Sequence, residues 1–457
     1  MRSRKAGLAA AILALATITG TLTAPGPALA AEPDPVIGKA VFNNPAGTKA
    51  QQNTVYQQVA RLIDRVPANA ELRLSMFHFE PPVTADTAED PDITARLLRA
   101  YERNVSVKIV LDQASNGFTA TARLRQALGT DDTKASFVVS CDDVYKVTRG
   151  CIGTRTYTWA DGSKSTSYNH NKFMAISKLT LNDGSAVNNV VYQASANMTL
   201  WDANEGYNNA LTVADTTLYN AYLKYHKDLV SLRKTAAGNS NYYTDSGSGT
   251  DYRAFFFPRR EGSGEAYTGS ATDTIYNTLN SVKCSYKDEA GVTRQTDVRV
   301  MQLAFNRTPI ATKLAELKKA GCWVDVVATD YSWNVLKELE KQKVQATRCN
   351  WNHAPGIDVR VHHKYMLIDG GYDDDIIPRT YTGSHNFAWS ALRLADEALI
   401  RVMGRATHDD YMRNFWSIRD TCRPKPNGEI KYPLPAEPPA AASGVEAQAE
   451  GIEQLQP

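Results

Sequence analysis

The chain has 457 residues, 43% of them hydrophobic and 22% charged, which is long enough for two domains or one duplicated domain. Its formal net charge is +2, so overall charge gives no argument for a nucleic-acid-binding protein, although a local basic cleft remains compatible with this value.

The N-terminal segment has the features of a secretory signal peptide. Three basic residues precede an apolar stretch over residues 6–22, and an Ala-x-Ala sequence follows at 28–30. This pattern predicts export with cleavage near Ala30. Loss of the three basic residues would change the formal charge from +2 to −1. No later apolar run is long enough to span a bilayer, so we expect a secreted, soluble and near-neutral mature protein.

Six cysteines in an exported chain indicate disulfide bonds. Cys141 and Cys151 are close enough in sequence to close a small loop. For the other four, our interpretation is one bridge between Cys322 and Cys349 and another between Cys284 and Cys422, although sequence alone does not choose among the possible pairings. The Cys and His spacings of a zinc site are absent from the sequence.

The first half of the chain alternates predicted helices and strands. Apolar residues at helical spacing predict helices over 50–65, 93–103 and 218–233. Alternating or β-branched runs predict strands over 71–79, 105–111, 170–176, 188–193 and 209–213. Residues 112–167 form a long region to which we assign no element.

A similar pattern returns after a Gly/Ser/Asn/Asp-rich linker over 234–263. Helices are predicted over 272–282, 310–319 and 408–420, and strands over 298–305, 323–328, 359–368, 379–382 and 397–402. The repetition predicts two similar α/β domains, 31–233 and 264–432, packed face to face. Residues 433–457, rich in Pro, Ala, Glu and Gln, are predicted to be a disordered tail.

Both halves carry the same set of polar residues in the same order. The shared pattern is His-x-Lys in one strand and Ser-x-Asn after the next. These residues are His170, Lys172, Ser195 and Asn197 in the first half, and His362, Lys364, Ser384 and Asn386 in the second. Because residues two apart on a strand point to the same face, each pair is expected to act on one ligand group.

These motifs resemble the HxKxxxxD and GSxN motifs of the phospholipase D superfamily, which occur once in each half of its members. The resemblance extends over about residues 42–422, and it implies one active site shared by the two halves. Asp369 stands at the motif's Asp position in the second half, whereas Ser177 stands there in the first. We interpret this Asp as a supporting residue and not as a reacting group.

The resemblance implies that His170 is the nucleophile and His362 the general acid and base, although the residues alone do not decide which is which. A neutral imidazole can attack a phosphodiester and form a phosphohistidine, while a protonated one supplies the leaving oxygen with a proton. Lys172 and Lys364 would stabilise the negative charge that develops on the phosphate oxygens, so no metal or cofactor is expected. The Ser and Asn pairs would donate hydrogen bonds to the same phosphate.

Each histidine also needs a carboxylate that orients its second nitrogen. In the second half the candidate is Glu397, eleven positions after Asn386. In the first half the same count ends at Asn208, which carries no charge, and the nearby Glu205 is the alternative.

The expected function is that of a secreted, monomeric phospholipase D. It would hydrolyse glycerophospholipids at a membrane or vesicle surface to phosphatidic acid and the head-group alcohol, or pass the phosphatidyl group to another alcohol. Two alternatives stay open. One is a secreted nuclease with the same site, against which the near-neutral charge is a mild argument. The other is a degenerate, non-catalytic phospholipid-binding protein, motivated by Ser177 and the missing first-half carboxylate.

Overall fold

A computed structural model describes residues 32–159, 162–247, 251–266 and 268–435. The chain divides into two units, Met1–Glu32 and Pro33–Pro457, and the second unit contains both motifs. The predicted signal peptide and residues 436–457 of the predicted tail lie outside the described residues. Within the described part, no helix combines the length and the apolar character needed to cross a membrane.

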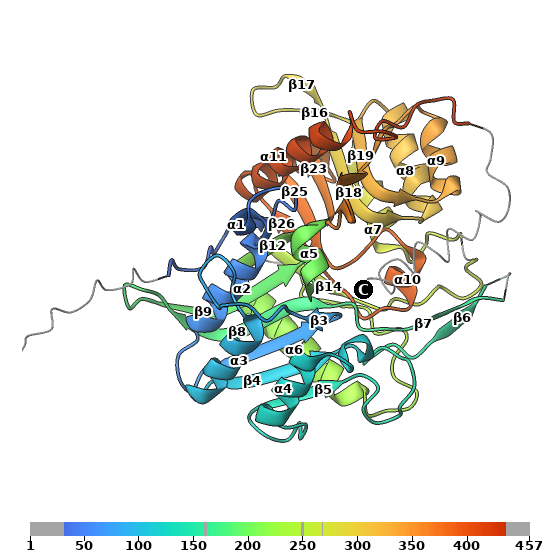
Figure 1. The fold of residues 1–457 in the computed structure, drawn as a ribbon. Coiled ribbons are helices and arrows are strands. Elements are labelled where there is room, and N and C mark those ends of the chain that lie inside the picture. The colour runs from blue at the N-terminus through green and yellow to red at the C-terminus, as the bar shows by residue number, and fades with distance from the viewer. Residues whose placement is uncertain (1–31, 160–161, 248–250, 267, 436–457) are drawn as a thin grey trace, which may run out of the picture. The chain divides into compact units, whose positions relative to one another are not determined.

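The first half builds a seven-stranded mixed sheet in the order β1–β12–β9–β8–β2–β4–β5 (Figure 1). Its strands are β1 (Ala40–Phe42), β2 (Glu71–Met76), β4 (Ser106–Leu111), β5 (Phe137–Ser140), β8 (Lys172–Thr180), β9 (Ala186–Ala194) and β12 (Asn209–Ala214). β2, β4 and β5 run parallel, whereas β8, β9, β12 and β1 continue the sheet by antiparallel pairing.

The second half repeats this arrangement in an eight-stranded sheet ordered β13–β14–β26–β25–β23–β18–β19–β20. Its strands are β13 (Thr244–Asp245), β14 (Tyr252–Phe256), β18 (Asp297–Phe305), β19 (Trp323–Tyr331), β20 (Gln345–Arg348), β23 (Lys364–Asp369), β25 (Arg379–Gly383) and β26 (Ala398–Met403). If β13 is left out, the strands of this sheet follow the same spatial order as those of the first sheet, and neighbouring strands have the same relative directions. The predicted internal repeat of two α/β halves is therefore confirmed.

Helices cover both sheets, and side-chain caps define where several of them begin. Asp92 accepts a hydrogen bond from Ala95 N at the start of α3, and Asp215 accepts one from Leu218 N at the start of α6. The helices are α1 (Lys49–Gln52), α2 (Thr54–Asp64), α3 (Ile93–Glu102), α4 (Thr119–Leu128), α5 (Leu200–Asn204), α6 (Thr216–Leu232), α7 (Thr274–Asn280), α8 (Thr308–Lys319), α9 (Trp333–Glu340), α10 (Trp389–Arg393) and α11 (Arg405–Cys422), with a 3-10 turn at Gln113–Ser115.

Short strands complete the described elements. They are β3 (Phe79–Glu80), β6 (Thr156–Thr158), β7 (Lys164–Thr166), β10 (Met198–Thr199), β11 (Gly206–Tyr207), β15 (Val282–Lys283), β16 (Ser285–Lys287), β17 (Thr293–Gln295), β21 (Asn350–Ala354), β22 (Ile357–Val361) and β24 (Gly371–Tyr372). The pairing of β11 with β22 joins the first half to the second.

Each half has its own hydrophobic core, and a further core is common to both. In the common core, Tyr222 and Tyr225 of α6 pack against Phe256 of β14, with ring centroids 5.1 and 4.3 Å apart. Aromatic pairs of this kind stabilise a contact beyond the area that they bury. The halves are thus joined by hydrophobic packing as well as by strand pairing.

The structure differs from the prediction in several segments, three of which bear on the site or on the boundary between the halves. The strand expected over 359–368 is two strands, β22 and β23, separated at His362 and His363. The unassigned region 112–167 contains α4, β5 and the hairpin of β6 and β7. The predicted linker over 234–263 contains β13 and β14, so the second sheet begins inside it.

Two of the three predicted disulfides are wrong. The bridge between Cys141 and Cys151 is present, but the others join Cys284 to Cys322 and Cys349 to Cys422. Cys284 meets Cys322 because Thr296 N donates to Cys284 O while Trp323 N donates to Thr296 O, which brings the two segments together at the start of β18 and β19. This proximity depends on sheet register, which cysteine spacing does not encode.

Candidate active site

Each histidine of the two HxK motifs is held by the opposite half of the molecule. His170 N donates to Asp396 O at 3.0 Å, and His170 Nδ1 lies 2.7 Å from Glu397 Oε1. His362 N donates to Tyr207 O at 3.0 Å, and His362 Nδ1 lies 2.8 Å from Asn208 Oδ1. The same two-point attachment occurs twice, so the two motifs meet where the halves join.

These contacts indicate which nitrogen of each imidazole carries a hydrogen. Carboxylate and amide oxygens only accept hydrogen bonds, so Nδ1 of each ring must carry the hydrogen that it donates. The ring's second nitrogen, Nε2, is then the atom that can attack phosphorus or exchange a proton. Both rings are buried, which prevents reorientation by solvent.

The two motif lysines are placed identically in the two halves. Lys172 and Lys364 are the first residues of β8 and β23. Each Nζ donates to the carbonyl oxygen of the motif histidine two residues earlier, at 2.9 and 3.1 Å. Both side chains are fully buried. Burying an ammonium group costs free energy unless it is compensated, so two such burials beside two histidines indicate a site for an anion.

The motif serines support the segments that hold the histidines. Ser195 Oγ accepts from Asn209 N at 3.0 Å and donates to Asn208 Oδ1 at 2.8 Å. Ser384 Oγ accepts from Ala398 N at 3.1 Å and lies 3.3 Å from Ala398 O. The serines thus position residues 208 and 397. Their predicted donation to a phosphate stays a prediction.

The motif asparagines lie beside the ends of the central strands. Asn197 Oδ1 is 3.4 Å from His78 N, just after β2. Asn386 Oδ1 is 3.5 Å from Ala304 N, in β18. The two residues are therefore equivalent in the repeat, and both are buried.

The carboxylate partners differ from those that we expected within each half. Glu397 contacts His170 of the first half and not His362 of its own half. Glu205, the alternative carboxylate of the first half, instead accepts a hydrogen bond from Asp358 N at 3.3 Å through its Oε2. A count of positions within one half does not show this exchange of partners, because the exchange arises from packing between the two halves.

Asp202, which the sequence reading missed, is the carboxylate beside His362. Its Oδ1 lies 3.2 Å from His362 Nδ1, and both side chains are fully buried. Burial alone would raise the pKa of Asp202, but the contacts with His362, Thr199 and Asn197 together outweigh it and hold the pKa below its usual value. The sequence offered only Thr199-x-x-Asp202, a pattern typical of a helix start, and Thr199 does cap α5.

The fourth motif position lies five residues along each strand from the motif lysine, at the end of β23 and within β8. Asp369 is the last residue of β23 and accepts from Arg405 at 2.9 and 3.0 Å. Ser177 of β8 accepts from Glu71 N at 2.9 Å. Both residues form hydrogen bonds to other elements of their own half. The change from Asp to Ser therefore alters a structural contact that is separated along the strand from the motif histidine.

Aromatic rings surround the two histidines. Phe77 and Tyr168 lie 5.1 and 5.5 Å from His170, and Trp201 lies 5.3 Å from His362, each with its ring edge-on. A pocket of about 220 Å³ adjoins Phe77 and Tyr168, and Asp112 is part of its lining. Burial raises the pKa of Asp112 to about 7.

A second buried carboxylate, Asp396, fastens the first half's disulfide loop to the second half. It accepts hydrogen bonds from Gly153 N at 2.8 Å and Ile152 N at 3.0 Å, next to Cys151. Burial nevertheless raises the pKa of Asp396 to about 7. Because Asp396 directly precedes Glu397, this attachment also fixes the segment that holds His170.

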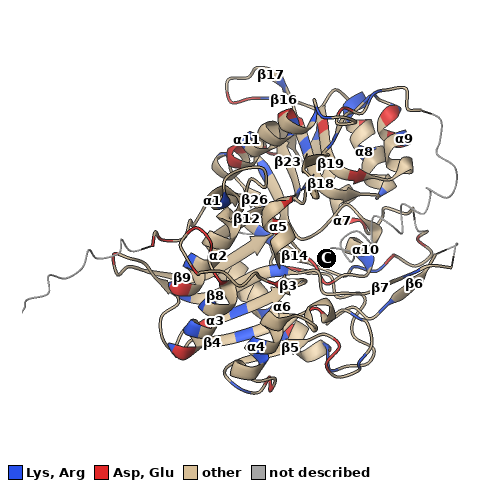
Figure 2. Cartoon of the chain, viewed as in Figure 1, with Lys and Arg blue, Asp and Glu red and all other residues tan. Residues whose placement is uncertain are grey.

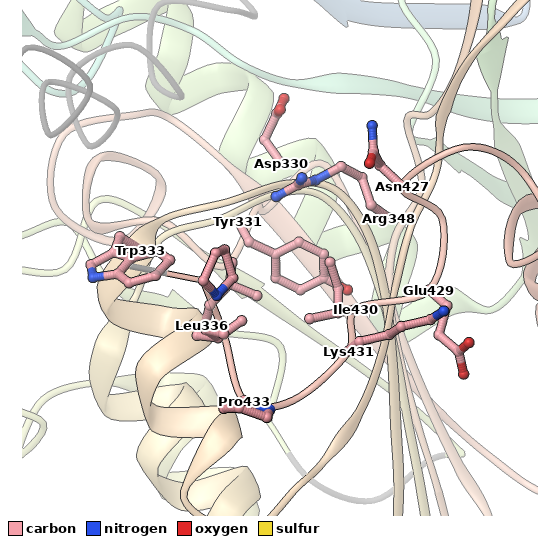
Figure 3. A pocket seen from close by; sticks show the side chains of 12 residues that line it. Asp330, Tyr331, Trp333, Leu336, Arg348, Asn427, Glu429, Ile430, Lys431 and Pro433 are labelled. Carbon is pink, nitrogen blue, oxygen red and sulfur yellow. The ribbon is translucent and has the colours of Figure 1, made fainter. Parts of the chain in front are cut away.

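The second half carries a larger pocket of about 800 Å³ between β19, α9 and residues 427–435 (Figure 3). Asp330 and Arg348 lie at one edge, and Tyr331 and Leu336 form an apolar wall. Among the described residues that line this pocket, neither histidine–lysine pair is included. Pocket size therefore does not identify the site, whereas the repeated buried charges do.

The fold and the repeated motif define a class of protein with two α/β halves and one histidine–lysine site at their junction. The family model described as "Cardiolipin synthase, PLD-like domain" matches residues 62–230 and 292–419, one segment in each half. These segments make up more than half of the chain, so the chain belongs to this PLD-like family.

Solved structures are similar to this chain at low sequence identity, and a phosphatidylserine synthase shares its fold. Phosphatidylserine synthase of Haemophilus influenzae Rd KW20 is 12% identical, with a TM-score of 0.52, and the match covers 91% of this chain and 94% of that one. Polyphosphate kinase of Porphyromonas gingivalis is 13% identical with a TM-score of 0.48, and the match covers 88% of this chain but only 52% of the kinase. Nuc of Salmonella typhimurium is 16% identical with a TM-score of 0.26, covering 42% and 92%. Among curated proteins, no sequence matches significantly.

Proposed function

We propose that this chain is a phospholipase D that hydrolyses glycerophospholipids to phosphatidic acid and a head-group alcohol. The observation that carries the proposal is the duplicated arrangement in which each motif histidine is held by the opposite half and is followed by a buried lysine. A phosphodiester is the substrate that this arrangement fits, because its reaction needs one nucleophile, one acid and fixed positive charge.

In the first step, Nε2 of His170 attacks phosphorus and the bond from phosphorus to the head-group oxygen breaks. His362 gives its Nε2 proton to the departing oxygen, so the head group leaves as a neutral alcohol. Glu397 stabilises the positive charge that His170 gains on forming the phosphorus–nitrogen bond. Lys172 and Lys364 stabilise the charge on the phosphate oxygens in the crowded transition state.

In the second step, His362 accepts a proton from water, and the water oxygen attacks phosphorus. The phosphorus–nitrogen bond breaks, which releases phosphatidic acid and restores both imidazoles. An alcohol that enters in place of water would give a new phosphodiester by the same proton transfers. Hydrolysis and transfer to an alcohol therefore use the same residues.

Three observations favour a phospholipid over a nucleic acid. The matching family model is described by the name of a cardiolipin synthase, and the fold resembles that of a phosphatidylserine synthase. In addition, Lys and Arg are interspersed with Asp and Glu along the ribbon of both halves (Figure 2), whereas proteins that bind nucleic acids commonly cluster basic residues.

Secretion is part of the proposal. Three disulfides join all six cysteines, and such bonds persist in oxidising compartments. Together with the predicted signal peptide, they support an extracellular enzyme that meets phospholipid at a membrane or vesicle surface.

The test compares hydrolysis of phosphatidylcholine vesicles and of plasmid DNA, with EDTA present, by the wild-type protein and by His170→Ala. A matched control is His353→Ala, which removes an exposed histidine of β21. We expect choline release that survives EDTA, is lost in His170→Ala and is unchanged in His353→Ala. DNA cleavage with this dependence would instead establish the nuclease. Absence of both activities would contradict the proposal and favour the non-catalytic binding protein.

A further inference from the structure

The two halves of the site differ at one repeated position. Glu397 and Asn208 each directly follow the residue whose carbonyl accepts the backbone N–H of a motif histidine. Each also lies beside the motif serine of its own half, through Ala398 and Asn209 respectively. His170 therefore has a carboxylate where His362 has a neutral amide oxygen, 2.7 and 2.8 Å away. An amide oxygen accepts the Nδ1 hydrogen but carries no charge to balance an imidazolium.

Asp202 of α5 supplies a charge at nearly the same place. Its Oδ1 is 3.2 Å from His362 Nδ1. The carboxylate is held by three donors, which are Thr199 Oγ1 at 2.6 Å, Asn197 N at 3.0 Å and Asn208 Nδ2 at 3.3 Å. The last of these links Asp202 to the amide that also contacts His362. A carboxylate fixed in this way cannot turn away from the ring.

We propose that Asp202 is the positioning carboxylate of His362. Glu397 provides the negative charge beside His170. Beside His362 this charge comes from Asp202 of α5 and not from residue 208. The inference rests on the proposed function only for the catalytic role of His362. Asp202 holds the Nδ1 hydrogen and stabilises the imidazolium when His362 carries its second proton. The proton itself is exchanged at Nε2.

Other groups also face His362. Lys364 Nζ donates to His362 O at 3.1 Å on the β23 side. His363 is the next residue, and burial keeps its pKa well below the usual value, so it stays neutral. Trp201 covers one side of the ring. Among these neighbours, Asp202 is the negative charge in contact with Nδ1.

The direct test is a pH titration of the imidazole nitrogens by NMR. The chain has 8 histidines, and His362→Gln assigns the signal of His362. The variants are Asp202→Asn, Asn208→Asp and the double variant, which moves the carboxylate from 202 to 208. We expect the pKa of His362 to fall by at least about one unit in Asp202→Asn, to rise in Asn208→Asp and to return toward the wild-type value in the double variant.

Turnover provides a second readout. With a diester substrate, we expect kcat to fall at least about tenfold in Asp202→Asn with little change in KM, and to recover in the double variant. Asp215→Asn is the matched control, because Asp215 also binds a helix N-terminus but lies outside the site. It should lower thermal stability and leave the titration of His362 unchanged.

An unchanged pKa of His362 in Asp202→Asn would overturn the inference. A double variant that folds like the wild type but does not return the pKa of His362 toward the wild-type value would also overturn it. If Asp202→Asn fails to fold, the double variant still tests the inference, because it removes Asp202 and keeps one carboxylate beside His362 Nδ1. If the wild-type protein hydrolysed no diester, the proposed function would fail while the NMR titration would still decide the role of Asp202.

Discussion

At the scale of single residues, the two histidines are equivalent in position but not in environment. His170 meets a carboxylate directly, whereas His362 meets an amide and, slightly further away, Asp202. A reaction that needs one neutral and one protonated imidazole requires such different environments. The asymmetry around a symmetric motif is therefore consistent with two distinct roles.

Replacing Glu397 by Gln should lower turnover sharply. The amide oxygen keeps the hydrogen bond to His170 but loses the charge that stabilises the ring after attack on phosphorus. We expect kcat to fall about a hundredfold or more at constant substrate affinity. Steady-state kinetics over a pH series measures this, and a variant with wild-type kcat would exclude an electrostatic role for Glu397.

The two buried aspartates predict a pH dependence of stability. Burial raises the pKa of Asp112 and of Asp396 to about 7, against about 3.9 in an unfolded chain. Between these values the folded state binds more protons than the unfolded state, so stability falls as pH rises from about 4 to 7. Thermal unfolding should show a decline in Tm on the order of a few degrees over this range.

The matched variant for this effect is Asp112→Asn. It should lower Tm at every pH, because one oxygen that accepts from Ala114 N or Asn169 N is lost. It should also flatten the decline between pH 5 and 7, since one titrating group is gone. An equally steep decline in the variant would show that Asp112 is ionised in the folded state over this range.

The spacing of polar residues was sufficient to find the two histidine–lysine pairs, the Ser-x-Asn pairs and Glu397 as members of one site. It was not sufficient to pair them. Glu397 and His170 are far apart in sequence, and their contact is created by packing of the halves. Asp202 gave no signal, because a helix-capping pattern accounts fully for an acid at that position.

At the scale of elements, the pairing of β25 with β26 positions both Ser384 and Glu397. Gly383 pairs with Leu399, and a Cβ at Gly383 would overlap the carbonyl oxygen of Ala398. Gly383→Ala must therefore push the two strands apart. We expect a loss of roughly 1–3 kcal/mol in the free energy of unfolding, with activity reduced more than stability, as measured by chemical denaturation and turnover at saturating substrate.

A suitable comparison for this variant is Gly117→Ala, where a Cβ would meet nothing within 4 Å. It should leave both stability and turnover close to the wild-type values. If Gly383→Ala behaved in the same way, the close approach of β25 and β26 would not be needed to place Glu397.

The disulfide pairs in the structure differ from two of the pairs that we expected from the sequence. Peptide mapping under non-reducing conditions should find Cys284 joined to Cys322 and Cys349 joined to Cys422. Replacing Cys284 and Cys322 by Ser should cost about 2–4 kcal/mol, since the bridge spans 38 residues. Fragments that join Cys322 to Cys349 would contradict the fold at the start of β18 and β19.

The elements themselves were predictable where periodicity is strong, and they were missed where tertiary contacts decide. The strand signal over 359–368 was continuous, yet the chain breaks at His362 and His363 because His362 N turns to bond Tyr207 O of the other half. Conversely, α4 lies in a region with no assigned element, although Ala120, Leu124 and Leu128 recur at helical spacing and are buried.

At the scale of the whole Pro33–Pro457 unit, the halves exchange structural elements as well as site residues. α6 of the first half contributes to the core shared with β14, and Phe42 of β1 packs 5.1 Å from Tyr411 of α11. Backbone pairing of β11 with β22 adds a third connection. The internal repeat was visible in the sequence, but the mutual dependence of the halves was not, since it consists of contacts between them.

The central claim is that these halves form one phosphodiesterase site with one covalent intermediate. The most direct measurement is mass spectrometry of the protein quenched during turnover of a phosphodiester, with peptide mapping of the adduct. We predict at most one phosphoryl or phosphatidyl group per chain, on His170 as the nucleophile, and no adduct in a variant with both histidines replaced by Ala. An adduct on another residue, or turnover by the double variant, would contradict the account.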